Sequence, residues 1–360
     1  MIGGVPRRVD AATKATIIDL VDQAVEEGWS ARRATKLVGV GELRLRRWRS
    51  RLDRLDDARG GGSPVHGLLP SEVEEILALA EEWGPVDRSH RKLAHRGSYL
   101  GRVWVGASTV LRVLVRAGHK LPGQRARARP ERKPWPDWVT YRPNTVWGWD
   151  VTHFTRCKPA PNCFAVIDLV SRKWIATLLS AEETSTQVEV VFTAALESEG
   201  LMAEVEARLE ATTNTPLAPV DNDDEARPIL LAVSDNGPEM TSGSTREFMA
   251  MCSIAQHFGR PGVPTDQAPV ESFFGHIKAE WPELEESRDP EALRLTLERV
   301  RREFNGVRLH AGIGYVTPND EHEGRGPAVR AARKAGLERA RQARIAYHRQ
   351  QREQRSEPPA

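Results

Sequence analysis

The sequence has few cysteines and no long hydrophobic run. Only three of its 360 residues are cysteine (Cys157, Cys163 and Cys252), and they form neither a Cys-x-x-Cys pair nor a Cys/His zinc spacing. We expect them to be small core residues in a reducing compartment. The absence of an eighteen-residue apolar stretch excludes an ordinary transmembrane helix, and MIGGVPRRVDAATKA at the start lacks the apolar segment of a signal peptide. A cytoplasmic location without a membrane partner is therefore expected.

Charge is distributed unevenly along the chain, although the net charge is only +2. Residues 1–140 contain 26 Lys and Arg against 17 Asp and Glu, and residues 324–360 contain 10 against 3. The segment between them, 141–323, contains 16 against 30. Two basic ends around an acidic centre indicate nucleic acid as the partner, with phosphates bound at the ends. Solvated helices with exposed charge are the alternative explanation.

Residues 1–58 predict an N-terminal helix-turn-helix. A helix over 13–27, a second helix after the N-cap Ser30, and the basic segment GELRLRRWRSRLDR (41–54) follow one another with a short glycine-bearing turn. We expect Leu43, Leu45 and Trp48 to pack inward. The arginines of the basic helix are the expected DNA-binding residues: Arg44, Arg46, Arg47, Arg49 and Arg51. An amphipathic basic helix of another purpose is the alternative.

A second helical unit is predicted over residues 68–120, after a flexible linker at 59–67. Its helices are expected near 71–83, 89–98 and 106–118, again as a helix-turn-helix. In the last helix we expect Leu111, Leu114 and Val115 to face the core and Arg112 to bind DNA. Residues 121–140 mix prolines with basic residues, which predicts an extended connector that lies along DNA. The DNA-binding residues expected there are Arg127, Arg129 and Lys133.

From residue 141 the pattern changes to strands. TVWGWDVTHFT (145–155) predicts a strand, and CFAVIDLVSRKWIATLLS (163–180) predicts a hairpin around Ser171–Lys173. The later predictions are a helix at 184–198, an irregular surface insertion at 200–228, strands at 228–235 and near 255–258, a helix near 244–252 between them, and a helix from about Val270 to Glu280. This order indicates a mixed sheet flanked by helices over residues 141–320.

Three acidic residues of this segment are candidate metal ligands. Asp150 lies in the middle of the first strand, Asp235 ends a later one, and Glu271 lies in the first turn of a helix, with 35 residues between it and Asp235. An unpaired buried carboxylate costs several kcal/mol, whereas three that converge suit Mg²⁺ and phosphoryl chemistry. Taken singly, Asp235 could close a turn, Glu271 could favour a helix start, and Asp150 could be an exposed strand residue.

The blocks WGWDVTHF, VSDNGPEM and DQAPVESFFGHIKAE resemble the three catalytic blocks of DDE transposases of bacterial insertion sequences, which are relatives of retroviral integrases. The 35-residue spacing is typical of that family. FNGVRLHAGIGYVTP (304–318) resembles the block that follows the catalytic helix. The resemblance covers roughly residues 25–320. It departs from the common family pattern at Asp266-Gln267-Ala268 and at Phe304-Asn305, and neither change removes a ligand.

The resemblance implies a ribonuclease H-like catalytic domain that cleaves DNA at the element ends and joins them to target DNA. It assigns Asp150, Asp235 and Glu271 as the catalytic, metal-binding acids, with two Mg²⁺ ions, or Mn²⁺, as cofactors. Lys278, nearly two helical turns after Glu271, matches the family's basic residue, with a solvated lysine as the alternative. Glu280 is expected to be a structural partner. Arg308 and His310 match the later block and are expected to bind DNA.

The implied partners are terminal inverted repeats and target DNA, bound by a homo-oligomer in the bacterial cytoplasm near the nucleoid. Residues 321–360 are a basic tail, either a helix that orders on DNA or on another subunit, or a disordered segment. Two alternative functions share these features. A metal-dependent nuclease would stop after hydrolysis, and a DNA-binding regulator would carry a silent catalytic domain.

Overall fold

The computed structural model describes residues 5–6, 8–56, 64–119, 136, 138–214, 227–235, 237–258 and 264–356, without the side chains of 212–214, 264–271 and 355–356. The chain divides into two compact units, residues 1–67 with 348–360, and residues 68–347. Each is described by itself. Within the described ranges, none of the helices is both long and apolar enough to cross a bilayer.

The first unit contains three helices and a 3₁₀ turn: α1 (Ala11–Glu26), α2 (Ala31–Val38), α3 (Glu42–Arg49) and η1 (Leu52–Arg54). The predicted cap is confirmed, because the Ser30 hydroxyl accepts a hydrogen bond from the amide of Arg33. Helix α2 ends at Gly39, whose φ of 76° suits glycine. The short connection between α2 and α3 agrees with the predicted helix-turn-helix.

The core of this unit corrects one predicted contact. Leu45 is buried with Ile17 and Val21 of α1, and Trp48 packs against the same cluster. Leu43, however, is 68% exposed. Successive helical residues are rotated by about 100°, so Leu43 and Leu45 project in nearly opposite directions, and only one of them can face α1.

The second unit begins with α4 (Pro70–Asp87), α5 (His90–Tyr99) and α6 (Ala107–Arg116). The three helices are confirmed, but the predicted core face of α6 is partly wrong. Leu114 is buried together with Val110 and Val113, whereas Leu111 and Val115 are exposed. Val110 and Val113, four residues and one residue before Leu114, lie on its buried side of the helix, and Leu111 and Val115 do not.

A five-stranded sheet forms the centre of the second unit, with the strand order β3-β2-β1-β4-β5. Its strands are β1 (Val146–His153), β2 (Asn162–Asp168), β3 (Trp174–Ser180), β4 (Leu230–Ser234) and β5 (Ile254–Phe258). The first three strands are antiparallel, which confirms the predicted hairpin, and β4 and β5 run parallel to β1. This is the predicted ribonuclease H-like mixed sheet.

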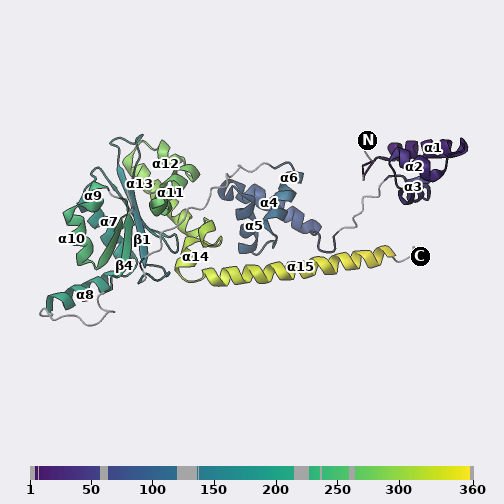
Figure 1. The fold of residues 1–360 in the computed structure, drawn as a ribbon. Coiled ribbons are helices and arrows are strands. Elements are labelled where there is room, and N and C mark those ends of the chain that lie inside the picture. The colour runs from purple at the N-terminus through teal and green to yellow at the C-terminus, as the bar shows by residue number, and fades with distance from the viewer. Residues whose placement is uncertain are drawn as a thin grey trace. The chain divides into compact units, whose positions relative to one another are not determined.

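Helices cover both faces of the sheet (Figure 1). One apolar cluster joins Trp147 and Trp149 of β1 to Phe192, and the other joins Ala165 of β2 to Ile277. The helices on the first face are α7 (Ser185–Ser198), α8 (Met202–Asn214), α9 (Pro238–Thr241) and α10 (Gly243–Met251), and those on the second include α11 (Pro264–Glu280), α12 (Glu283–Glu286) and α13 (Pro290–Gly306). The chain continues through η2 (Ala311–Ile313), α14 (Pro318–His322) and α15 (Gly326–Ser356).

Three boundaries differ from the predictions. Helix α11 begins at Pro264, before the predicted start at Val270, since proline is well tolerated in the first turn of a helix. Helix α8 occupies part of the predicted irregular insertion, and residues 215–226 lie outside the described ranges. The basic tail is helical over α14 and α15, which confirms the ordered alternative.

Candidate active site

The pairing of β1 with β4 brings Asp150 and Asp235 to the same level of the sheet. The parallel register places Gly148 beside Val233, and each acid lies two residues further along the chain. Neighbouring strands are about 4.8 Å apart, and residues two apart in a strand share a face. The two carboxylates therefore start from adjacent backbones on one face.

That face is the one covered by α11. Asp150 is paired with Ala165 across the antiparallel ladder of β1 and β2, and directly opposite residues share a face. Ala165 is buried in the cluster that contains Phe274 and Ile277 of α11. Asp150 thus faces α11, the helix that carries Glu271.

The local bonds of the two aspartates differ. Asp150 is half-buried, and its Oδ1 accepts from the amide of Val151 at 2.9 Å. Asp235 is exposed directly after β4, and its Oδ1 accepts from the amide of Gly237 at 3.0 Å. Asp235 therefore closes a turn, as the milder interpretation holds, and it does so directly after the end of β4.

Glu271 lies within α11, but its side chain is outside the described residues. Lys278 projects from nearly the same side of the helix. Its Nζ donates to the carbonyl of His153, at the end of β1, at 3.0 Å and pairs with Glu285 at 2.7 Å. The described side chains contain no group of three His, Cys, Asp or Glu arranged to hold a metal ion. Because Glu271 is not among them, its metal-binding role stays a prediction.

Two further glutamates border the aspartates, and sequence reasoning missed both. A Cβ added to Gly237 would lie 2.5 Å from Oε1 of Glu239 and 3.2 Å from Oδ1 of Asp235, so both carboxylates lie against this glycine. Burial, and then the charges of Glu183 and Asp235, raise the pKa of Glu239. Oε2 of Glu183 lies 2.9 Å from Nε2 of His153, which is hydrogen-bonding distance. The sequence signal that could have indicated Glu239 is its position in the block VSDNGPEM, which also contains Asp235.

A donor set of carboxylate oxygens fits a hard divalent cation. Mg²⁺ and Mn²⁺ prefer such oxygen ligands and retain positions for water and phosphate. Burial raises the pKa of Glu239, and the charges of Glu183 and Asp235 add to this effect; a cation bound nearby would relieve such repulsion. Among the described residues, Asp150 and Asp235 stay the predicted ligands.

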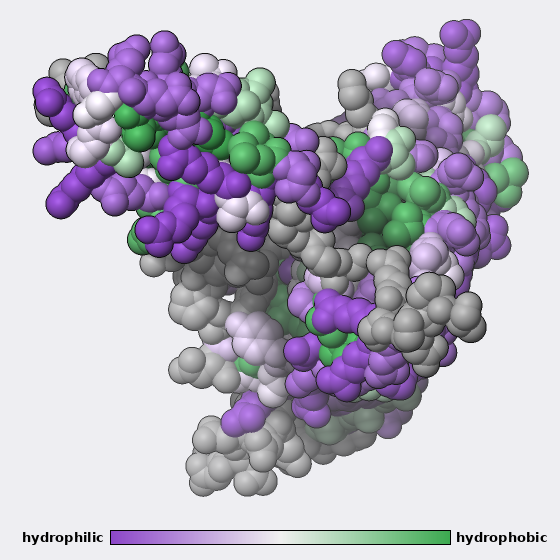
Figure 2. Space-filling model, turned by 90° about the vertical axis from the view of Figure 1, so that its right-hand side faces the viewer, coloured by the Kyte–Doolittle hydropathy of each residue, from purple (hydrophilic) through white to green (hydrophobic). Residues whose placement is uncertain are grey.

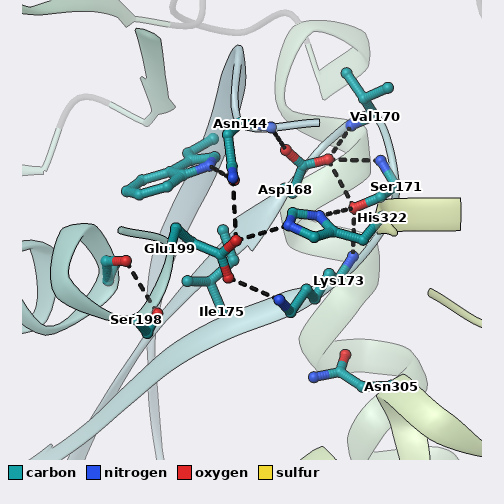
Figure 3. Close-up of polar contacts among 12 residues, drawn as sticks. Asn144, Asp168, Val170, Ser171, Lys173, Ile175, Ser198, Glu199, Asn305 and His322 are labelled. Carbon is teal, nitrogen blue, oxygen red and sulfur yellow. Dashed lines mark hydrogen bonds and ion pairs between the residues drawn. The ribbon is translucent and has the colours of Figure 1, made fainter. Parts of the chain in front are cut away.

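A second polar cluster, at the start of β1, resembles a hydrolase triad but is structural (Figure 3). Ser171 Oγ lies 2.9 Å from Nδ1 of His322, whose Nε2 lies 2.6 Å from Glu199. Ser171 is fully buried, and its hydroxyl donates to Asp168 at 2.8 Å. A nucleophile needs contact with its substrate, so this cluster instead ties α14 to the sheet and to the end of α7.

The predicted DNA-binding arginines of α3 divide into two groups. Arg46, Arg47 and Arg51 are exposed. Arg44 donates to the carbonyls of Val5 and Pro6, and Arg49 pairs with Asp22, so these two also hold the unit together. Most of the coloured side chains in Figure 2 are hydrophilic, with apolar patches among them. DNA binding by all five stays a prediction.

The remaining predicted DNA-binding residues have different environments. Arg112 is exposed on α6 and bonds to Ser108 of its own helix. Arg127, Arg129 and Lys133 lie outside the described residues.

Arg308 and His310 have roles inside the protein that sequence reasoning did not anticipate. Arg308 is buried and makes a bidentate ion pair with Glu280, which agrees with the structural role expected of Glu280. His310 is half-buried and accepts from the amide of Gly312 through Nδ1 at 3.1 Å. Burial, with nearby Arg308, lowers its pKa. The contacts of Arg308 leave its guanidinium engaged with a carboxylate instead of facing solvent.

Comparison with protein families identifies the central segment. Two models described as "Integrase core domain" match residues 140–264 and 252–318. Together they span the five strands and helices α7 to α13.

Curated relatives match parts of the chain. They are an "ATP-dependent protease" of Lactococcus lactis subsp. lactis, 25% identical over 35% of this chain and 41% of the relative, and the "Transposase for insertion sequence element IS904" of Lactococcus lactis subsp. lactis (strain IL1403), 23% identical over 49% and 61%. An "Insertion element IS476 uncharacterized 39.2 kDa protein" of Xanthomonas euvesicatoria is 31% identical over 24% and 25%. The matches thus span between a quarter and about three fifths of these relatives' lengths.

One solved structure similar to this chain is the HTLV-2 integrase catalytic core domain in complex with magnesium. It is 19% identical, with a TM-score of 0.34, over 50% of this chain and 97% of that one.

Proposed function

We propose that the chain is a DDE transposase, because residues 140–264 and 252–318 match models of the integrase core domain and part of the chain is similar to a transposase of an insertion sequence. In this proposal it cleaves DNA at the ends of a mobile element and joins those ends to target DNA. The observation that supports the proposal is the parallel register of β1 and β4, which pairs Gly148 with Val233, each two residues before one of the acids.

Three acids would hold the cofactor, with Asp150 and Asp235 supplied by adjacent strands and Glu271 by α11. Bound Mg²⁺ or Mn²⁺ ions, two in the full proposal, would favour deprotonation of water and stabilise charge on the phosphate oxygens. The aspartates orient the scissile phosphodiester, and Lys278, beside the end of β1, adds positive charge near the DNA strand.

The chemistry requires no covalent intermediate with the protein. Water attacks the phosphodiester at the element end, the bond to the 3′ oxygen breaks, and a free 3′-OH results. That hydroxyl attacks a target phosphodiester, forming one bond and releasing one 3′ oxygen, so the number of phosphodiesters is conserved in the joining step. Two ends must be joined to one target, which implies a homo-oligomer on DNA.

The basic N-terminal helices would recognise the terminal repeats. In this proposal, exposed Arg46, Arg47 and Arg51 on and after α3, and Arg112 on α6, bind phosphates or base edges. This assigns recognition to the helical units and chemistry to the sheet.

Joining of a pre-cleaved element end to plasmid DNA, with Mg²⁺ or Mn²⁺ present, tests the proposal. We expect Asp150→Asn and Asp235→Asn to abolish cleavage and joining while end binding is retained. Glu247→Gln, an exposed acid on α10, is the control and should keep full activity. Cleavage without joining would identify a nuclease. End binding that is the same in the wild type and in Asp235→Asn, with no chemistry in either, would identify a regulator.

A further inference from the structure

Helix α5 presents a row of basic residues to the end of α11. Lys92 and Arg96 are spaced by four residues and therefore share one side of α5, and Arg88 is the C-cap of α4, two residues before α5 begins. The two terminal nitrogens of Arg88 donate to the carbonyls of Ala279 and Glu280 at 3.2 and 3.3 Å. These are the last carbonyls of α11, where a positive charge is favourable.

The side chain of Glu280 strengthens the same junction. Arg308 binds its carboxylate with two hydrogen bonds of 2.6 Å, and Nζ of Lys92 lies 3.8 Å away. Burial opposes ionisation of Glu280, but Arg308 and Lys92 outweigh it and lower its pKa. The end of α11 is thus bound by side chains from α5 and from the segment after α13.

Arg96 fixes α5 itself against this segment. Its guanidinium makes two hydrogen bonds to Asp87, at 2.9 and 3.2 Å, and donates to the carbonyl of Val307 at 2.7 Å. Both charged side chains are fully buried. A buried bidentate pair has little freedom of orientation, so the distance between α5 and the residues around Arg308 is narrowly defined.

Helix α15 makes a second, separate set of contacts with the three helices α4 to α6, which we call the α4–α6 unit. Arg333 donates to Ser98 of α5 and to the carbonyls of Gly314 and Tyr315, and Arg344 binds Glu72 of α4. At Gly336 an added Cβ would lie 2.0 Å from the Trp104 indole nitrogen, so the helix approaches the unit closely. The unit is therefore attached to the sheet domain through two separate sets of contacts.

We propose that the α4–α6 unit is a positioning element for the catalytic helix. Arg88 and Lys92 hold the C-terminal end of α11, and thereby set where Glu271 stands relative to Asp150 and Asp235. They act through α11 and do not contact the reacting atoms. This inference rests on the proposed function, in which Glu271 is catalytic. It also implies that DNA bound by α6 affects the position of α11.

The test variant is Arg88→Asn combined with Lys92→Gln. Arg88 has a φ of 46°, which asparagine tolerates, so the end of α4 should be retained. We expect the rate of joining a pre-cleaved end at saturating DNA to fall about tenfold, which corresponds to about 1.4 kcal/mol, while end-binding affinity changes less than about twofold. Exchange of the amide hydrogens over 272–280 should become faster.

Two comparison variants make the test specific. Arg91→Gln, exposed on α5, should change neither joining nor exchange. Arg88→Lys with Lys92→Arg keeps the charges and should restore most of the joining rate. An unchanged joining rate in the test variant, or an equal loss of binding and joining, would overturn the inference. Should the wild type join no DNA, the proposed function fails, and unchanged exchange over 272–280 would separately overturn the positioning role.

Discussion

Replacement of Asp87 by alanine should destabilise the 68–347 unit by about 3–5 kcal/mol, the usual cost of breaking a buried ion pair from one side. The side chains of Asp87 and Arg96 are 1% and 2% exposed. Without the carboxylate, the buried guanidinium retains a neutral acceptor, the Val307 carbonyl, in place of a charged one. Its desolvation is then no longer offset.

A surface ion pair provides the contrast. Arg294 is bonded to Glu291 at 2.6 Å and to Glu298 at 2.6 Å. The bond to Glu291 raises the pKa of Arg294, yet these side chains are about half exposed or more. Solvent screens such pairs, so Glu291→Ala should leave the denaturation midpoint within experimental error.

Urea denaturation followed by tryptophan fluorescence measures the difference. Trp83 lies 4.2 Å from the guanidinium of Arg96 and should report on this region. Asp87→Ala combined with Arg96→Met removes both charges and should recover most of the lost stability. A loss below about 1 kcal/mol in the single variant, or an equal loss in the double variant, contradicts the reasoning.

Three further predictions follow from the packing and charges. Gly336→Ala should lower the melting temperature of the full chain, because its methyl group overlaps Trp104, whereas Gly275→Ala, which meets no atom within 4 Å, should not. Burial opposes ionisation of Glu199, but His322, Lys173 and Asn144 lower its pKa to about 2. The stabilising contribution of ionised Glu199 is complete above its ordinary pKa of 4.5 and is lost as pH falls toward 2. In Glu199→Gln the free energy of unfolding should therefore depend less on pH over that range. An unchanged pH dependence argues against this role. Replacing exposed Arg46, Arg47 and Arg51 by glutamine should reduce the slope of log affinity for DNA against log salt concentration by about 2–3. Lys36→Gln on α2 is the comparison variant with another basic residue replaced. An unchanged slope would show that these arginines do not bind DNA phosphates.

The strands and the two aspartates were predictable because strand geometry repeats every two residues. The prediction that Asp150 and Asp235 converge needs their strands to pair in parallel, and β1 and β4 do pair in parallel, with Gly148 opposite Val233. The hairpin around Ser171–Lys173 had the same local basis, since both strands and the turn are adjacent in sequence.

Helix phase and distant contacts were not predictable in this way. Leu43 is as hydrophobic as Leu45, and Leu111 as Leu114, so local pattern does not decide which one is buried. Arg308 matched a block associated with DNA, but its partner Glu280 is 28 residues away. The bonds of Arg88 to α11 join residues more than 190 positions apart, a relation that follows from three-dimensional docking alone.

The placement of charge separates structural from functional acids in this domain. Buried Asp87 pairs with Arg96, and Glu199 with Lys173 and His322, so each negative charge has a basic partner that lowers its energy. Around Asp235 the balance is reversed, because burial and neighbouring carboxylates raise the pKa of Glu239. An arrangement that costs stability in the protein alone is characteristic of functional sites. A bound cation would relieve this repulsion, so the charge around Glu239 agrees with the metal site of the proposed function.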